Sequence, residues 1–207
     1  MQNPKYKAVV FDLYTALLDS WSLWNRIAGS PERGTNWRQK YLQLTYQAGS
    51  YRAYEDIIVA SAEQSGLSAE TAQALITDWA SVNPWPETNE VLHALSERVP
   101  LAIATNSSVK LAEIAVARLG VSIPAVATAE ESGYYKPQPQ TYRLALERVG
   151  ASAENTLFVA GSASDVPGAM GVGLQVFWHN RARLAPLAGQ VAPQHLSDSL
   201  QPLLELV

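Results

Sequence analysis

Polar and charged side chains follow four apolar runs in this chain, each at the point where the run ends. They are Asp12 after the first run, Thr105 and Asn106 after the second, Lys136 after the third and Asp165 after the fourth. Taken singly, Asp12 could be a turn residue, Asn106 a helix cap and Lys136 a solvated loop charge. Because ligands bind beyond the carboxyl ends of parallel strands, we expect these side chains to meet in one site.

The elements that must position these residues can be found from the hydrophobic pattern. Short continuous apolar runs are typical of strands buried on both faces of a parallel sheet. Such runs lie within residues 6–14, 99–105, 125–128, 156–161 and 174–179. Helical patterns at 108–120 and 138–150, a short helix beginning near Ser164 or Asp165, and a closing segment at 196–207 separate or follow them. This alternation predicts an α/β fold, with a Rossmann-like core of parallel strands flanked by helices.

Residues from about 20 to 85 break the alternation and contain most of the six tryptophans. Successive helical patterns occupy residues 36–49, 54–66 and 68–82. The simplest interpretation is a helical-bundle cap inserted after the first strand. We therefore expect a core formed by residues 1–18 and 86–207 and a cap formed by residues 19–85.

Composition excludes several classes of function. Hydrophobic residues make up 47% of the 207 residues, charged residues make up 16%, and the formal net charge is −4. This charge argues against nucleic acid or an anionic membrane surface as a partner. The absence of cysteine excludes disulfides, thiolate metal sites and a cysteine nucleophile. With no apolar run long enough for a signal peptide or a membrane span, we expect a soluble cytoplasmic protein.

The strings at the four strand ends resemble those of the haloacid dehalogenase superfamily. They are "FDLYTALLD", "IATNSS", "YYKPQPQTY" and "VAGSASDVPGA". Two features narrow the resemblance to the L-2-haloacid dehalogenases: a tyrosine six residues after the lysine, and the string "WRQKYLQLT" in the predicted cap. The resemblance covers essentially the whole chain.

Two missing acids bear on the chemistry that the resemblance implies. Phosphatases of the superfamily place a second aspartate where this chain has Tyr14, and that aspartate protonates the leaving alkoxide. A halide leaving group needs no proton, so Tyr14 favours carbon–halogen cleavage. Phosphatases also use a further acid for Mg²⁺ where this chain has Ser162, so we expect neither a metal nor another cofactor.

The resemblance also implies roles for individual residues in hydrolysis of a carbon–halide bond. Asp12 would attack C2 of a short 2-halocarboxylate and form an ester, with Lys136 keeping the carboxylate ionised. Asp165, together with Tyr142 and Lys136, would position the water that hydrolyses the ester. The product would be a 2-hydroxy acid with inverted configuration.

Other residues would bind the substrate and the departing halide. Arg38 and Asn106 would receive the halide, since a guanidinium is delocalised and weakly hydrated. The substrate carboxylate would contact Thr105 and the backbone amides near Leu13 and Tyr14. The pocket wall would contain Trp37, Tyr14 and either Trp21 or Trp24, with Ser162 nearby.

Several positions depart from the dehalogenase pattern. Thr15-Ala16 replaces Gly-Thr after the tyrosine, Ala160 and Ser162 replace a serine and an asparagine, and Ser164 replaces a tryptophan. Three alternatives therefore stay open: a related hydrolase that opens a strained ring such as azetidine-2-carboxylate, a metal-dependent phosphatase, and a binding protein that kept the fold. The resemblance permits a homodimer formed through the cap.

The three histidines lie outside these strings. We expect His93, His179 and His195 to be surface or core residues without a role in chemistry.

Overall fold

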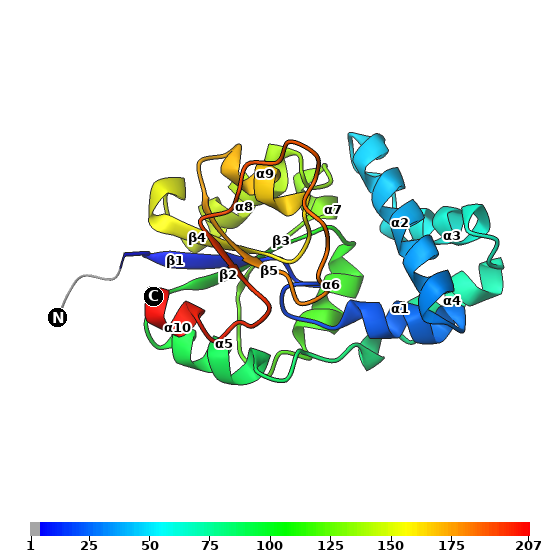
Figure 1. Ribbon diagram of the computed structural model, residues 1–207, viewed down its shortest axis with the longest axis horizontal. Coiled ribbons are helices and arrows are strands. Elements are labelled where there is room, and N and C mark those ends of the chain that lie inside the picture. Colours follow the sequence, from blue (N-terminus) through cyan, green and yellow to red (C-terminus); the bar gives the residue numbers. More distant parts are fainter. Residues whose placement is uncertain (1–4) are drawn as a thin grey trace.

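A computed structural model describes residues 5–207 of the chain, and its centre is a parallel β-sheet (Figure 1). Within these residues the sheet has six strands in the order β3-β2-β1-β4-β5-β6, and every neighbouring pair is parallel. The strands are β1 (Ala8–Phe11), β2 (Leu101–Thr105), β3 (Ala125–Thr128), β4 (Thr156–Ala160), β5 (Gln175–His179) and β6 (His195–Ser197).

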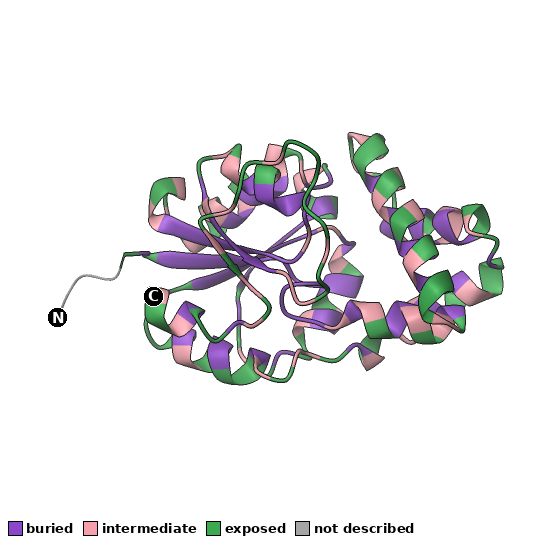
Figure 2. Cartoon of the chain, in the orientation of Figure 1, coloured by how far each residue is buried: buried purple, intermediate pink, exposed green. Residues whose placement is uncertain are grey.

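The sequence explains why the sheet has two apolar faces. Side chains alternate along a strand, so Val9 and Phe11 of β1 join one core cluster while Val10 joins the other. The central strands are buried along their whole length (Figure 2). Phe11, the last residue of β1, pairs with Ile103 and Val159, so neighbouring strands end close together at one edge of the sheet.

Helices cover both faces of this sheet. One core cluster packs the sheet against α5 (Thr88–Ser96), α6 (Val109–Val116) and α10 (Leu203–Leu206). The other packs it against α8 (Pro139–Val149) and α9 (Asp165–Met170). The short elements α7 (Ala129–Ser132) and η2 (Ala153–Asn155) precede α8 and β4.

The segment after β1 forms a separate helical layer beyond the ends of the strands, at the right of Figure 1. We call this layer the cap and define it as residues 20–81. It consists of α1 (Ser20–Ala28), α2 (Pro31–Ala48), α3 (Tyr54–Gln64), α4 (Ala69–Thr77) and the 3₁₀ turn η1 (Trp79–Ser81). The chain enters and leaves the cap side by side, because Leu18 and Pro84 form an antiparallel bridge.

Capping side chains stabilise the first turns of three cap helices, of which α1 was not predicted and α2 begins at Pro31, before the predicted start at residue 36. Asp19, Ser30 and Ser68 accept hydrogen bonds from backbone amides in the first turns of α1, α2 and α4. Four aromatic rings then fill the space between the helices. The ring centroids are 4.7–5.7 Å apart in the pairs Trp24–Trp37, Trp24–Tyr41 and Tyr41–Tyr54. Aromatic packing thus gives this small layer a core of its own.

The cap also touches the core far from the crossing at Leu18. The amide of Tyr51 donates to the Gly133 carbonyl at 2.7 Å, and the Tyr135 hydroxyl donates to the Arg52 carbonyl at 2.6 Å. The rings of Tyr51 and Tyr135 stack with centroids 5.4 Å apart. Ser108, the N-cap of α6, donates to Glu55 at 2.8 Å. We call residues 50–55 the cap rim.

The α/β class and the inserted helical layer agree with the sequence prediction. The five predicted strands are present, but the pattern did not predict β6, whose residues are partly or fully exposed. β6 shares the closing segment 195–207 with α10, so this segment is not a single helix. Among residues 5–207, no helix is both long enough and apolar enough to cross a bilayer.

Candidate active site

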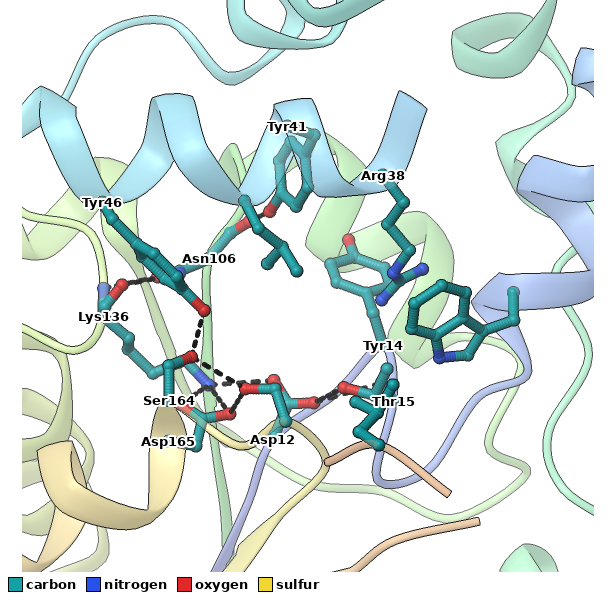
Figure 3. A pocket seen from close by; sticks show the side chains of 14 residues that line it. Asp12, Tyr14, Thr15, Arg38, Tyr41, Tyr46, Asn106, Lys136, Ser164 and Asp165 are labelled. Carbon is teal, nitrogen blue, oxygen red and sulfur yellow. Dashed lines mark hydrogen bonds and ion pairs between the residues drawn. The ribbon is translucent and has the colours of Figure 1, made fainter. Parts of the chain in front are cut away.

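A cavity of about 50 Å³ lies between the cap and the edge of the sheet where β1, β2 and β4 end (Figure 3). From the core it is lined by Asp12, Tyr14, Thr15, Asn106, Lys136, Ser162, Ser164, Asp165 and Leu184. From the cap it is lined by Trp21, Arg38, Tyr41, Leu42 and Tyr46. The strand-end residues predicted from sequence therefore meet in one place, apart from Thr105.

Asp12 is the most heavily hydrogen-bonded group in the cavity. Its Oδ1 atom accepts from Lys136 Nζ at 2.9 Å. Its Oδ2 atom accepts from the Thr15 hydroxyl at 2.7 Å, the Thr15 amide at 3.1 Å and the Ala16 amide at 3.3 Å. The two oxygens therefore have different surroundings. Oδ1 faces the ammonium group of Lys136, and Oδ2 accepts three hydrogen bonds from the turn that follows β1.

Two side chains from elsewhere in the core contact the backbone carbonyls of the turn that carries these donors. Trp85 Nε1 donates to the Thr15 carbonyl at 3.0 Å, and His179 Nδ1 is 2.8 Å from the Ala16 carbonyl oxygen. A side chain at Gly161 would collide with Thr15 and the Ala16 backbone, so glycine is required for the end of β4 to approach the turn. We call Trp85 and His179 the turn clamp.

Lys136 joins the two carboxylates. Its Nζ atom is 2.9 Å from Asp12 Oδ1 and 3.0 Å from Asp165 Oδ1. Asp165 also accepts hydrogen bonds from Tyr142 Oη at 2.8 Å and Ser162 Oγ at 3.1 Å. Asn106 fixes the lysine backbone from both sides, accepting from its amide at 2.6 Å and donating to its carbonyl at 3.0 Å.

Burial and neighbouring charges shift the pKa values of Asp12 and Asp165 in opposite directions. Burial alone would raise the pKa of Asp12, but the Lys136 ammonium and the hydrogen bonds from Lys136 and Thr15 outweigh it, so the pKa is lowered. Burial raises the pKa of Asp165, and the negative charge of Asp12 adds to this, against the opposing effect of Lys136. Burial opposes the charge of Lys136, but Asp12 and Asp165 more than compensate and raise the lysine pKa. Asp12 is therefore the group that stays ionised, and Asp165 is the one suited to take up a proton.

A buried positive charge faces this carboxylate system from the cap. Arg38 is 6% exposed, donates to the Ser20 hydroxyl at 2.7 Å and lies 4.2 Å from the centroid of the Trp21 ring. Within the described part of the chain Arg38 forms no ion pair, whereas Lys136 forms two. A buried guanidinium without a carboxylate partner is suited to bind an anion.

Some predicted site residues do not line the cavity. Tyr142 is fully buried and reaches the site through its hydrogen bond to Asp165. The expectation for Trp37 needs correction, since its indole donates to Ser61 Oγ at 2.9 Å within the cap. Its ring packs against Trp24 in the cap, and Trp37 is absent from the cavity wall that contains Arg38.

The expectations for two core residues change for a similar reason. Thr105 is fully buried at the end of β2 and is absent from the cavity wall, while the next residue, Asn106, lines it. Thr105 is the last residue of β2 and is packed within the sheet, whereas Asn106 lies in the bend that follows. The Leu13 side chain is packed in the core, which leaves only its backbone near Asp12. Of the two tryptophans considered for the wall, Trp21 lines it and Trp24 packs in the cap.

Sequence reasoning missed several lining residues. Tyr41, Leu42 and Tyr46 follow Arg38 by three, four and eight positions, which places all four on one face of α2. This spacing is a signal that could have identified them. Leu184 follows β5 in an irregular segment and has no comparable signal.

The residues present do not fit a bound metal ion. Both carboxylates of the cavity already bind the Lys136 ammonium, which supplies the positive charge there. Residues 5–207 contain no group of three or more His, Cys, Asp or Glu side chains arranged to hold a metal. Oxygen-rich cages of the kind that Mg²⁺ and Ca²⁺ need are therefore not formed by these side chains.

The histidines are not part of the cavity wall. His93 is exposed beside Glu97, and His195 lies on β6. His179 is buried, and its contact with the Ala16 carbonyl gives it a structural role beside the site that was not expected.

Known proteins are similar to this chain in sequence. The family profile of haloacid dehalogenase-like hydrolases matches residues 6–173. An (S)-2-haloacid dehalogenase of Xanthobacter autotrophicus is 30% identical over 95% of this chain and 82% of its own length. One from Pseudomonas putida is also 30% identical, over 94% of this chain and 93% of its own.

Solved structures agree. The L-2-haloacid dehalogenase RSc1362 is 29% identical and superimposes with a TM-score of 0.87 over 98% of both chains. The Xanthobacter autotrophicus L-2-haloacid dehalogenase with chloropropionic acid covalently bound has the same fold, with a TM-score of 0.82 over 97% of this chain and 98% of that one at 24% identity. On the profile match and the full-length relatives, the chain belongs to the haloacid dehalogenase-like hydrolases and is similar to the L-2-haloacid dehalogenases.

Proposed function

We propose that the protein is a metal-independent (S)-2-haloacid dehalogenase, in which Asp12 displaces the halide and water then hydrolyses the resulting ester. The arrangement of Asp12, Lys136 and Asp165 opposite the unpaired Arg38 carries this proposal. It combines an ionised nucleophile, a second carboxylate able to accept a proton, and a separate place for an anion.

In the first step, Asp12 Oδ1 attacks C2 of the substrate from the side opposite the halogen. The carbon–oxygen bond forms as the carbon–halogen bond breaks, and the halide leaves with the bonding electron pair toward Arg38 and Asn106. Burial raises the pKa of Tyr14, so this residue remains a neutral phenol beside the reaction and is not a proton donor. Since the halide needs no proton, the missing acid does not slow this step.

In the second step, water attacks the carbonyl carbon of the ester while Asp165 takes one of its protons. Negative charge develops on Asp12 Oδ2, where the Thr15 and Ala16 amides already donate. These donors would act as an oxyanion hole. Breakdown of the intermediate cleaves the bond between the carbonyl carbon and the substrate oxygen, and a 2-hydroxy acid with inverted C2 leaves.

The size of the cavity bears on the length of the substrate. The cavity is small, with a volume of about 50 Å³, so we expect it to favour short acids over long ones. Tyr41, Leu42 and Tyr46 close the cap side against longer chains.

The test is to incubate purified protein with L-2-chloropropionate in the presence of a chelator. We expect stoichiometric chloride and D-lactate, no stimulation by Mg²⁺, and complete loss of turnover in Asp12→Asn. Failure to release halide from any two- or three-carbon 2-haloacid would rule out the proposal. Mg²⁺-dependent hydrolysis of a phosphate monoester would support the phosphatase alternative.

One feature favours a second candidate, the opening of azetidine-2-carboxylate by the same attack. Ser162, Ser164 and Tyr46 make one wall of the cavity polar. Hydroxyl groups suit a substrate whose leaving group is a ring nitrogen. That nitrogen must end as a protonated amine, and hydroxyls can hydrogen bond to it. The same assay with L-azetidine-2-carboxylate, monitored for the ring-opened hydroxy amino acid, separates the two candidates.

A further inference from the structure

A continuous row of hydroxyl groups leads from Asp165 to the surface. Ser162 Oγ donates to Asp165 Oδ2 at 3.1 Å and lies 3.2 Å from Ser164 Oγ. Ser164 Oγ in turn contacts the hydroxyl of Tyr46, which reaches down from α2 (Figure 3). Tyr46 is 39% exposed, whereas Asp165 is 4% exposed. Ser162 is also partly exposed, whereas Ser164 is buried, so the row joins the buried Asp165 carboxylate to two residues, Ser162 and Tyr46, that are in part exposed to solvent.

The proposed reaction needs such a connection. One 2-haloacid anion and one water give one 2-hydroxy acid anion, one halide and one proton. Asp165 takes a proton from the attacking water and returns one to the departing substrate oxygen, which leaves Asp12 as a carboxylic acid. Asp12 then returns to a carboxylate by passing its proton, by way of Lys136, to Asp165. One proton per turnover must therefore leave a pair of carboxylates that are both buried.

Other hydrogen-bond partners of Asp165 lead inward. Lys136 is 3% exposed and bonds only to the two carboxylates through its ammonium, and Tyr142 is fully buried. Of the side chains within residues 5–207 that hydrogen bond to Asp165, Ser162 alone continues to an exposed group.

We propose that Ser162, Ser164 and Tyr46 form a path that carries this proton from Asp165 to solvent. The proposal rests on the proposed dehalogenase function. Each hydroxyl accepts a proton on one side as it releases its own on the other, so every member is neutral before and after transfer. Each hydroxyl can act as donor or acceptor, as this transfer requires.

Electrostatics sets how the transfer occurs. Burial raises the pKa of Tyr46, and the charge of Asp165 adds to this. A tyrosinate does not accumulate under those conditions. We therefore expect Tyr46 to pass the proton on as a neutral phenol, so that loss of its hydroxyl or of the Ser164 hydroxyl slows the transfer.

Single-turnover kinetics can test the path, because the two chemical steps are seen separately. The rate of halide release reports attack by Asp12, and mass spectrometry of the protein reports decay of the ester. We expect Tyr46→Phe and Ser164→Ala to slow ester decay about tenfold or more relative to halide release by the same variant. Small buffers such as imidazole should restore decay in the variants and leave the wild type unaffected.

Tyr134→Phe is the matched control. Tyr134 is 38% exposed, close to the value for Tyr46, and lies outside the cavity wall. This variant should keep both rates. A wild-type burst followed by unchanged ester decay in Tyr46→Phe and Ser164→Ala would overturn the path alone. No wild-type burst would overturn the proposed function and the path together.

Discussion

The hydroxyl of Thr15 donates to Asp12 Oδ2 at 2.7 Å, although the dehalogenase motif that the chain resembles has its threonine at the position of Ala16. Residues 13–18 form a turn between β1 and α1, and the turn brings a hydroxyl back onto the carboxylate three residues earlier. The neighbouring Ala16 contributes its amide instead. The hydroxyl that supports Asp12, the proposed nucleophile, thus comes from a position one residue earlier than in that motif.

This geometry predicts the effect of replacing Thr15. Thr15→Ala removes one of three donors to Oδ2, and we expect kcat to fall about tenfold to a hundredfold. Thr15→Ser keeps the hydroxyl and should retain most activity. Chloride release measured at saturating substrate checks both variants. Equal activity of the alanine and serine variants would show that the amides suffice.

The turn clamp should act at a distance. Trp85→Phe removes the hydrogen bond to the Thr15 carbonyl, which should lower the free energy of unfolding by about 1 kcal/mol and kcat by several-fold. Urea denaturation and the chloride assay measure the two effects. Trp178→Phe is the control, since within residues 5–207 the Trp178 indole has no hydrogen-bond partner. We expect the control to keep kcat, so a parallel loss in both variants would contradict the clamp.

The alkaline side of the pH profile depends on Lys136. Burial opposes its charge, but two carboxylates raise its pKa above the ordinary value of 10.5. A raised lysine pKa means that the ammonium persists below that pKa and is lost only as pH rises through it. We therefore expect kcat/KM to stay level between about pH 8 and 10. Circular dichroism at each pH controls for unfolding, and a decline below pH 10 with the fold intact would contradict the assignment.

Neighbouring residues of α2 should give opposite results. Trp37→Phe leaves a gap and removes a donor in the cap core, so we expect about 1–3 kcal/mol of lost stability with kcat/KM within about twofold. Arg38→Gln removes the anion-binding charge, so kcat should fall at least about a hundredfold at small cost in stability. Thermal melting and chloride release compare them. Loss of activity from the folded Trp37→Phe protein would place Trp37 back at the site.

Most of the sheet could be predicted because a parallel sheet is buried on both faces and its strands are therefore continuous apolar runs. Asp12, Asn106, Lys136 and Asp165 were expected to lie together because each follows a predicted parallel strand, and the carboxyl ends of parallel strands lie on the same side of a sheet. β6 could not be predicted in this way, because it is an edge strand of three residues that are partly or fully exposed and form no continuous apolar run.

Side-chain direction limited the prediction of the site. Sequence strings placed Trp37 with Arg38 and Thr105 with Asn106, and in each pair one residue faces the cavity and its neighbour faces away. A sequence string shows that two residues are neighbours but not which of them lines a cavity. The Thr15 turn has no period, so its contact with Asp12 could not be predicted from sequence.

The hydrogen bonds of the cap rim bear on how substrate reaches the cavity. Tyr51 and Arg52 of the rim hydrogen bond to residues 133 and 135, directly before Lys136. A hinge opening of the cap would break these bonds and disturb the lysine, so we expect substrate and product to exchange through rearranged side chains while the cap stays docked. Turnover should then respond to the bulk of residues at the cavity mouth and be nearly insensitive to solvent viscosity.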